Sequence, residues 1–421
     1  MKNKFFTGFL SGLASSLVII AIAVVIYALS TAGLDGNSGV LNSQGKERNK
    51  ETVVKAETQD EEIQKIIKKI NKLENIIDQY YMEEVDRGKL ADGIYKGLVA
   101  SLGDPYSTYY TKDEYTALME SFTGVYYGIG STVSQNVSTG IITLVKPFVT
   151  GPAYEAGMLP GDILYMVEGE EVTGVDLTEV VSRMKGKEGT KVKLSVIREG
   201  VAEPIEFVIT RRRIEVPTIE YEMLDGNIGY IAISEFDEVT AQQFRDAIKD
   251  LEKQGQVGLV IDLRDNGGGS LDTVVNMLDR MLPEGLIVYT EDKHGIREEK
   301  KSDNKESFKK PLAVLINGNS ASASEIFAGA IQDYGIGTIV GTTSFGKGIV
   351  QSVIPMLEDG TAIKVTVSKY YTPNGRNIHG VGITPDVEEA LKEELRKQVV
   401  IDKKEDNQLQ KAVEVIKGKL K

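Results

Sequence analysis

The 421-residue sequence contains no cysteine, no tryptophan and only two histidines, His294 and His379. Without cysteine, the chain forms no disulfide, has no thiolate nucleophile and holds no cysteine-ligated metal. The two histidines are scattered and no HExxH pattern is present, so we predict neither a catalytic metal nor another cofactor. Covalent catalysis would therefore need a hydroxyl group.

Basic charge is also scarce, because 49 lysines and arginines stand against 62 aspartates and glutamates, which gives a formal net charge of -13. Binding to nucleic acid needs a basic face, so this balance argues against a nucleic-acid partner. The 41% of hydrophobic and 26% of charged residues are ordinary for a globular chain of two or three domains.

Charged residues are absent from residues 9–29. This apolar run of about 21 residues is long enough to cross a bilayer core, which needs about 20. Lys2 and Lys4 precede it, so the positive-inside rule predicts a cytoplasmic N-terminus. We predict a single-pass anchor over residues 1–32 that holds the remaining domains on the extracytoplasmic side of the cell membrane.

A cleaved signal peptide is the alternative, because the small residues 30–32 offer a plausible cleavage point. Residues 33–60 are polar and contain several glycines, serines and asparagines, so we expect a flexible linker there.

A helical arm is predicted over residues 61–121. Its first part has apolar residues every three or four positions, as in an amphipathic helix. The apolar face consists of Ile63, Ile66, Ile67, Ile70, Leu73, Ile76 and Ile77. Periodicity indicates that such a face is buried but not by what, so its partner is either the chain's own domains or a second copy. Residues 88–102 predict a second helix, and residues 102–115 a turn followed by a short one.

Two candidate reactive groups lie on adjoining turns between residues 317 and 351. An apolar run over 311–316 predicts a buried strand, followed by a tight turn and a helix that starts near Ser322. A strand over 335–340 and a glycine-rich turn then lead to Lys347. Both histidines lie in polar or glycine-flanked, loop-like contexts, so Lys347 is the better candidate for a general base.

Each of these turns has a second interpretation. Ser322 and Glu325 fit the S-x-x-E capping box, so Ser322 could simply cap a helix. Residues 341–347 match G-x-x-x-x-G-K, the front of a phosphate-binding loop. That match fails at Gly348, where a serine or threonine is required, and a β-prone run follows instead of a helix.

The next candidate turn, DNGGG at residues 265–269, follows a continuous apolar strand and precedes a helix. Its glycines lack the GxGxxG spacing of a dinucleotide-binding loop. They do allow backbone N–H groups to approach a developing oxyanion.

Three motifs together resemble the C-terminal processing proteases, or tail-specific proteases, a family of serine peptidases with a Ser-Lys dyad. They are SASASE at 320–325, FGKG at 345–348 with the Gln four residues after its Lys, and DLRDNGGG at 262–269. The last departs from the family's D-L-R-x-N-P-G-G, with Gly267 in place of the usual proline.

The resemblance implies that Ser322 is the nucleophile, Lys347 the general base, and Gln351 the residue that orients the lysine. It also implies an oxyanion hole formed by the N–H groups of Gly268 and Ala323. Because Gly267 replaces the usual proline, either Gly268 or Gly269 could supply the glycine N–H of the oxyanion hole. Ala323 fits independently, since N–H groups are free at a helix start.

Residues 122–212 resemble a PDZ domain, on the motifs YGIG at 127–130, GPAYEAG at 151–157 and LPGDIL at 159–164, with two closing strands. The predicted peptide-binding loop is Gly128, Ile129 and Gly130. Such backbone captures a terminal carboxylate while the peptide adds a strand to the sheet. A small β-domain without a ligand is the alternative.

Together these features predict a multidomain α/β chain: transmembrane anchor, helical arm, PDZ domain, a crotonase-like α/β serine protease core over 213–387 and a C-terminal helical segment over 388–421. The resemblance implies a serine endopeptidase that cleaves extracytoplasmic proteins recognised through accessible C-termini, and homodimers are one option.

Two other function classes remain as alternatives. One is a catalytically inactive PDZ-containing binding protein. The other is acyl-CoA chemistry on a crotonase-like fold, although the sequence shows no basic pocket for the CoA phosphates.

Overall fold

The computed structural model describes residues 44–303, 307–398 and 400–420. These residues form two compact units that meet between Arg87 and Gly88, and each unit is described by itself. The predicted anchor over 1–32 lies outside the described residues. Within the described ranges, no helix combines the length and the apolar character that a membrane span needs.

The first unit contains the long helix α2 (Gln44–Tyr80). The helix begins earlier than the sequence pattern indicated, so the C-terminal part of the predicted flexible linker over 33–60 is helical from residue 44 onward. Residues 44–60 are rich in lysine, glutamate and glutamine and contain no proline, a composition with high helix propensity. That propensity outweighed the polar character that suggested a linker.

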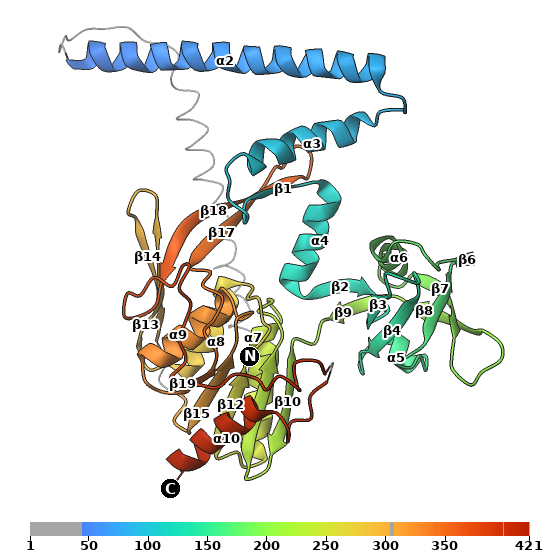
Figure 1. The fold of residues 1–421 in the computed structure, drawn as a ribbon, viewed down its shortest axis with the longest axis vertical. Coiled ribbons are helices and arrows are strands. Elements are labelled where there is room, and N and C mark those ends of the chain that lie inside the picture. The colour runs from blue at the N-terminus through green and yellow to red at the C-terminus, as the bar shows by residue number, and fades with distance from the viewer. Residues whose placement is uncertain (1–43, 304–306, 399, 421) are drawn as a thin grey trace, which may run out of the picture. The chain divides into compact units, whose positions relative to one another are not determined.

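The second unit begins with two further helices of the arm, α3 (Arg87–Ala100) and α4 (Lys112–Thr123), whose positions are labelled in Figure 1. Thr111 and Glu114 form a capping box at the start of α4. Between the helices, residues 108–110 form the short strand β1, which the sequence pattern did not predict.

The core of the second unit is a mostly parallel six-stranded sheet. In spatial order its strands are β10 (Ile219–Leu224), β11 (Ile228–Ile233), β12 (Gly258–Asp262), β15 (Leu312–Ile316), β16 (Thr338–Gly341) and β19 (Val387–Glu388). Only the β10–β11 pair is antiparallel. The central strands were predicted as continuous apolar runs, which is the pattern of strands buried on both faces.

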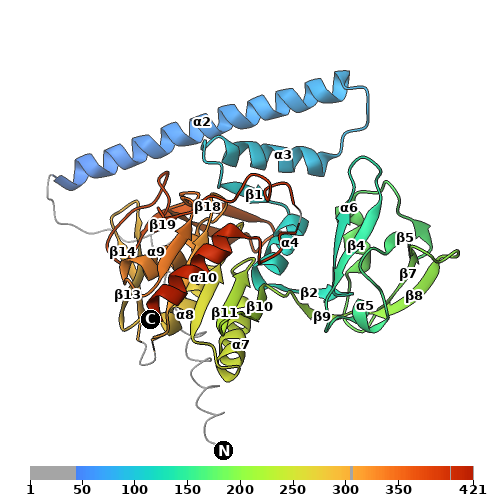
Figure 2. The ribbon, with the colours of Figure 1, turned by 60° about the horizontal axis from the view of Figure 1, so that its bottom comes forward.

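Helices cover both faces of this sheet (Figure 2). Helices α7 (Thr240–Lys253), α8 (Leu271–Met281) and α9 (Ala323–Asp333) pack with Ile261 and Val314 in one apolar cluster. Helix α10 (Asn407–Lys419) packs with Val260 and Ala313 in another. Neighbouring residues of a strand point to opposite faces, so both clusters draw on the same strands. The core is therefore an α/β layer structure, as predicted.

A second sheet adjoins the core and carries the chain that follows Lys347. Its strands are β1 (Thr108–Tyr110), β18 (Ala362–Tyr371), β13 (Gly285–Asp292) and β14 (Arg297–Ser302), with β17 (Ile349–Pro355) also paired to β18. Strand β1 pairs with β18 so that Thr108 lies opposite Lys364. The short segment before α4 is thereby joined to the α/β core.

The domain that resembles a PDZ domain in sequence has its own sheet and its own apolar core. Its elements are β3 (Ser131–Gln135), β4 (Ile142–Pro147), α5 (Pro152–Glu155), β5 (Ile163–Val167), β6 (Glu170–Glu171), α6 (Leu177–Met184), β7 (Lys191–Ile197) and β8 (Ile205–Thr210). A two-stranded ribbon of β2 (Val125–Gly128) and β9 (Arg212–Glu215) contains its entry and exit. This domain and the α/β core thus have separate apolar cores, which explains why each has a sequence pattern of its own.

Candidate active site

Ser322 lies at the N-terminal end of α9, the helix that the capping pattern predicted. Its backbone has φ 56° and ψ -114°, a left-handed conformation that a non-glycine residue rarely adopts. The Ser322 N–H donates to the Glu325 carboxylate (2.9 Å), as the capping box requires. A strained, half-buried serine at a strand-to-helix turn is a position that only its surroundings can maintain.

Those surroundings centre on Glu325, which is fully buried. Its Oε2 accepts hydrogen bonds from the backbone N–H groups of Ser322 (2.9 Å) and Lys347 (2.8 Å). Its Oε1 accepts from the Ser344 hydroxyl (2.5 Å) and the Gly346 N–H (2.7 Å). The capping carboxylate therefore joins the serine turn to the lysine turn.

Lys347 is half-buried, and burial lowers the pKa of its amine. The positive charge of Lys364 lowers it further, whereas the carboxylates of Asp104 and Glu325 act in the opposite direction. The Lys347 Nζ lies 4.8 Å from the centre of the Tyr106 ring. A lowered pKa increases the neutral fraction of the amine, which is the form that accepts a proton.

The glycine turn after β12 lies directly against the start of α9. A Cβ atom added to Gly268 would lie 2.8 Å from the Ser322 Cβ and 3.0 Å from the Ala323 N, so only glycine fits there. Gly269 instead packs against the backbone of Phe236. Of the two glycines that the sequence left open, Gly268 is thus the one that the structure brings against Ser322 and Ala323.

Asn266 anchors this turn from within the core, where it is fully buried. Its Nδ2 donates to the Ile233 carbonyl (2.8 Å), and its own carbonyl accepts from the Ala321 N–H (3.0 Å) and the Ser324 hydroxyl (2.9 Å). Its Oδ1 accepts from the Gly268 N–H (2.8 Å). An oxyanion at Gly268 would therefore have to replace Asn266 as the acceptor.

Gln351, the predicted orienting residue, lies on β17 beside a β-bulge between Val350 and Gln351. Its Nε2 donates to the Thr366 hydroxyl on β18 (3.3 Å). The Thr366 hydroxyl in turn donates to the carboxylate of Asp104 (2.6 Å). The structure thus connects Gln351, through Thr366, to the segment before α4.

In the domain that resembles a PDZ domain, the predicted loop residue Ile129 lines an apolar pocket of about 220 Å³. The other lining residues are Tyr126, Ser131, Val133, Phe148, Val181, Met184 and Lys185. The pocket therefore lies between β3 and α6. Gly130 has φ 75°, and Gly128 is the last residue of β2. Burial raises the pKa of Tyr126 to about 12, so this phenol stays neutral.

Three regions of the sequence match known families. Residues 227–389 match peptidase family S41, residues 144–198 a PDZ domain, and residues 27–114 the N-terminal domain of the activating protease CtpB. Two relatives from Bacillus subtilis, the carboxy-terminal processing proteases CtpA and CtpB, are each 37% identical to the chain. The matches cover 89% and 86% of this chain and 76% and 77% of the relatives.

The chain belongs to the carboxy-terminal processing proteases of peptidase family S41. Among solved structures, the photosystem II D1 C-terminal processing protease is 30% identical, with a TM-score of 0.44 over 75% of this chain and 86% of that one. The S41 peptidase is therefore a serine protease with a PDZ domain and an N-terminal helical region.

Gly348 shows why the S41 peptidase departs from a phosphate-binding loop. A Cβ atom added to Gly348 would lie 2.5 Å from the backbone N of His379, so a serine or threonine does not fit there. A strand, β17, follows the turn. Of the two histidines, His379 thus lies beside the lysine turn, while His294 is in the exposed turn between β13 and β14.

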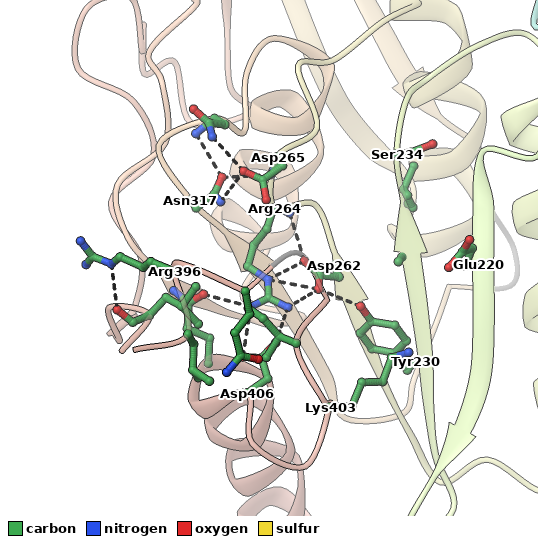
Figure 3. A pocket seen from close by; sticks show the side chains of 18 of the residues that line it. Glu220, Tyr230, Ser234, Asp262, Arg264, Asp265, Asn317, Arg396, Lys403 and Asp406 are labelled. Atoms are coloured by element: carbon green, nitrogen blue, oxygen red, sulfur yellow. Dashed lines mark hydrogen bonds and ion pairs between the residues drawn. The ribbon is translucent and has the colours of Figure 1, made fainter. Parts of the chain in front are cut away.

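Figure 3 shows a further cavity of the S41 peptidase, with a volume of about 1070 Å³. Its lining includes Asp265 and Asn317 but neither Ser322 nor Lys347. Each of its three cationic lining residues has an acidic partner: Arg264 is buried in ion pairs with Asp262 (2.6 Å) and Asp406 (2.8 Å), while Arg396 pairs with Glu393 (3.3 Å) and Lys403 with Glu222 (2.6 Å). Because these cations are already paired, the cavity gives no support to CoA-phosphate binding.

Two parts of the site were missed from the sequence. Asn266 was included only as part of a motif, although its buried side chain makes the contacts that hold the turn. Asp104 and Tyr106 lie in a segment interpreted only as a turn. The single local signal was that turn itself, in which Asp104 Oδ1 accepts from the Tyr106 N–H (3.0 Å).

Proposed function

We propose that this S41 peptidase is an endopeptidase that uses a Ser322–Lys347 dyad through an acyl-enzyme. The observation that supports this most strongly is the Glu325 carboxylate, which accepts hydrogen bonds from the N–H groups of both residues. Burial of Lys347 lowers its pKa in the direction that a general base requires.

In this mechanism, neutral Lys347 takes the proton from the Ser322 Oγ as that oxygen attacks the peptide carbonyl. The carbonyl oxygen becomes an oxyanion, which the free Ala323 N–H at the start of α9 stabilises together with a glycine N–H of the turn, Gly268 or Gly269. The protonated lysine then gives its proton to the leaving amine. Water releases the acyl group from Ser322 with Lys347 again acting as the base.

The PDZ domain supplies the substrates, in our proposal, by binding accessible C-termini of proteins. Support comes from the apolar pocket beside Ile129, which suits an apolar terminal side chain, and from the adjoining strand β3, on which a peptide can add a strand. Gly128, Ile129 and Gly130 would then provide the backbone for the terminal carboxylate.

Membrane anchoring and dimerisation complete the proposal. The uncharged run at residues 9–29 would hold the protease on the extracytoplasmic face of the cell membrane. The apolar face of α2 would pair with a second copy, because its isoleucine and leucine side chains are 43–58% exposed on the described helix. These are Ile63, Ile66, Ile67, Leu73 and Ile76.

The decisive experiment compares the full chain in detergent with its Ser322→Ala and Lys347→Ala variants on reduced casein, with the products read by mass spectrometry. We expect cleavage by the parent chain and none by either variant, with all three folded. Ser101→Ala, at an exposed turn, is the matched control and should cleave as the parent does. If no form cleaves casein, the inactive binding protein becomes the better assignment.

The anchor is tested separately. Membranes washed with carbonate should retain the protein, since about 21 buried apolar residues hold more tightly than a surface contact. A soluble mature form that begins near Gly33 would show cleavage at residues 30–32 instead.

A further inference from the structure

Asp104 is a charged residue outside the family's catalytic motifs whose carboxylate has three hydrogen-bond donors. Its Oδ2 accepts from the hydroxyls of Ser107 and Thr366, both at 2.6 Å, and its Oδ1 accepts from the Tyr106 N–H at 3.0 Å. Burial would raise the pKa of Asp104, but the hydrogen bonds from Ser107 and Thr366 hold it below its usual value. The group is therefore an ionised carboxylate that only accepts hydrogen bonds.

The segment that carries Asp104 is fixed to the protease core by backbone as well as by side chains. Strand β1, which begins four residues after Asp104, pairs with β18. The Thr366 N–H on β18 also donates to the Ser107 hydroxyl (3.1 Å). Asp104 and Thr366 are 262 positions apart in the sequence, so tertiary pairing alone creates this contact.

The direction of these hydrogen bonds determines how Gln351 is oriented. The Thr366 hydroxyl has one proton, and it donates that proton to Asp104. Towards Gln351 the same hydroxyl can then act only as an acceptor, which selects the Nε2 end of the amide (3.3 Å). The amide oxygen of Gln351 is consequently directed away from Thr366.

We propose that Asp104 is a positioning residue for the general base, and that through Thr366 it orients the Gln351 amide so that the amide oxygen serves Lys347. This inference rests on the proposed dyad. Without the carboxylate, the Thr366 hydroxyl is free to donate to Gln351, which would turn the amide round and present two N–H groups to a lysine that itself needs an acceptor.

The charge of Asp104 provides a second, separable readout. Three charged groups surround the Lys347 amine: Asp104 from the segment before β1, Lys364 from β18 and Glu325 from α9. The Tyr106 ring also lies next to this amine. The Asp104 carboxylate stabilises the protonated amine, in opposition to burial. Removing this charge lowers the pKa of Lys347, so the acid limb of the kcat/KM profile should move to lower pH.

The test uses the full chain in detergent, a quenched fluorescent peptide taken from a cleavage site mapped in casein, and the rate at which a fluorophosphonate labels Ser322. Five variants are compared: Asp104→Asn, Thr366→Val, Thr366→Ser, the double variant Asp104→Asn with Thr366→Val, and Asp113→Asn. The last removes the same charge from an exposed position at the start of α4.

We expect Asp104→Asn and Thr366→Val each to lower kcat roughly 10- to 100-fold with little change in KM, as a misplaced catalytic group does. Thr366→Ser keeps the hydroxyl and should stay near the parent chain, as should Asp113→Asn. The double variant should lose no more than either single variant, because both changes interrupt the same relay. Asp104→Asn should shift the acid limb, alone or in the double variant, whereas Thr366→Val alone should not.

Unchanged kcat in both Asp104→Asn and Thr366→Val would overturn the inference, as would losses that multiply in the double variant. If Asp104→Asn does not fold, the comparison of Thr366→Val with Thr366→Ser decides, since equal activity of these two excludes the relay. A failure of the dyad itself would appear elsewhere, as full activity and full fluorophosphonate labelling in Ser322→Ala or full activity in Lys347→Ala.

Discussion

The turns that hold Ser322 and Lys347 differ from the PDZ pocket in how they use polar groups, although both are built on glycine-rich backbone. In the core, the buried Glu325 accepts four hydrogen bonds that join the serine and lysine turns. In the PDZ domain, the pocket beside Ile129 and Val181 is lined mainly by apolar side chains. Chemistry needs atoms held at set distances, whereas recognition of varied C-termini needs an adaptable apolar surface.

The largest effect on activity should come from Lys347→Arg, which tests whether Lys347 is the general base. A guanidinium stays protonated at all working pH values and cannot accept the Ser322 proton, so we expect kcat to fall by at least about 1000-fold. In the parent chain, activity should rise with pH as the lysine, whose pKa burial lowers, loses its proton. A variant with near-parent activity would redirect the search for the base to His379.

Glu325→Gln should have the next largest effect, because it removes an acceptor and leaves amide hydrogens facing other donors. We expect about 2–4 kcal/mol of lost stability and roughly a 100-fold loss in kcat, given the cost of unpaired buried groups. Thermal unfolding and peptide kinetics measure the two effects. Glu393→Gln, at an exposed position, is the control. A variant as stable and active as the parent would show that the bridge between the turns is dispensable.

Val181→Lys tests whether the PDZ pocket recruits protein substrates. A charge in the apolar pocket should reduce the cleavage of casein about 10-fold through weaker capture of C-termini, while cleavage of a short peptide changes little. Val201→Lys, at an exposed PDZ turn outside the pocket, should affect neither substrate. Equal losses on both substrates would mean that the pocket does not recruit them.

The smallest effect is expected at Asp237, next to the point where the Glu238 N–H donates to the Phe122 carbonyl. Burial, with a contribution from Glu235, raises the pKa of Asp237 to about 7. Asp237 is protonated in the folded chain up to a pH of about 7, whereas in the unfolded chain its pKa is near 3.9. Its contribution to stability is therefore fully present below about pH 3.9 and is lost as the pH rises through about 7.

Asp237→Asn should therefore stabilise the chain by about 1–2 kcal/mol at pH 8 and by almost nothing at pH 4. Urea unfolding at the two pH values measures the difference. The same gain at both values would assign the effect to something other than this carboxyl group.

Local sequence patterns were sufficient for much of the core. The run at 311–316 predicted β15 because a parallel strand buried on both faces is apolar throughout. Ser322 and Glu325 predicted the start of α9 because capping depends on residues three apart. The start of α2 was missed, since polar residues of high helix propensity resemble those of a linker.

The sequence by itself determined which reactive groups the chain possesses, because the absence of cysteine and the scarcity of histidine leave serine and lysine. Only the tertiary structure decided that the capping Glu325 also reaches the Lys347 turn, and that Asp104 reaches Thr366 across 262 positions. Helix starts and buried strands follow from neighbouring residues. Contacts between distant segments depend on how sheets pair, for which the local pattern contains no signal.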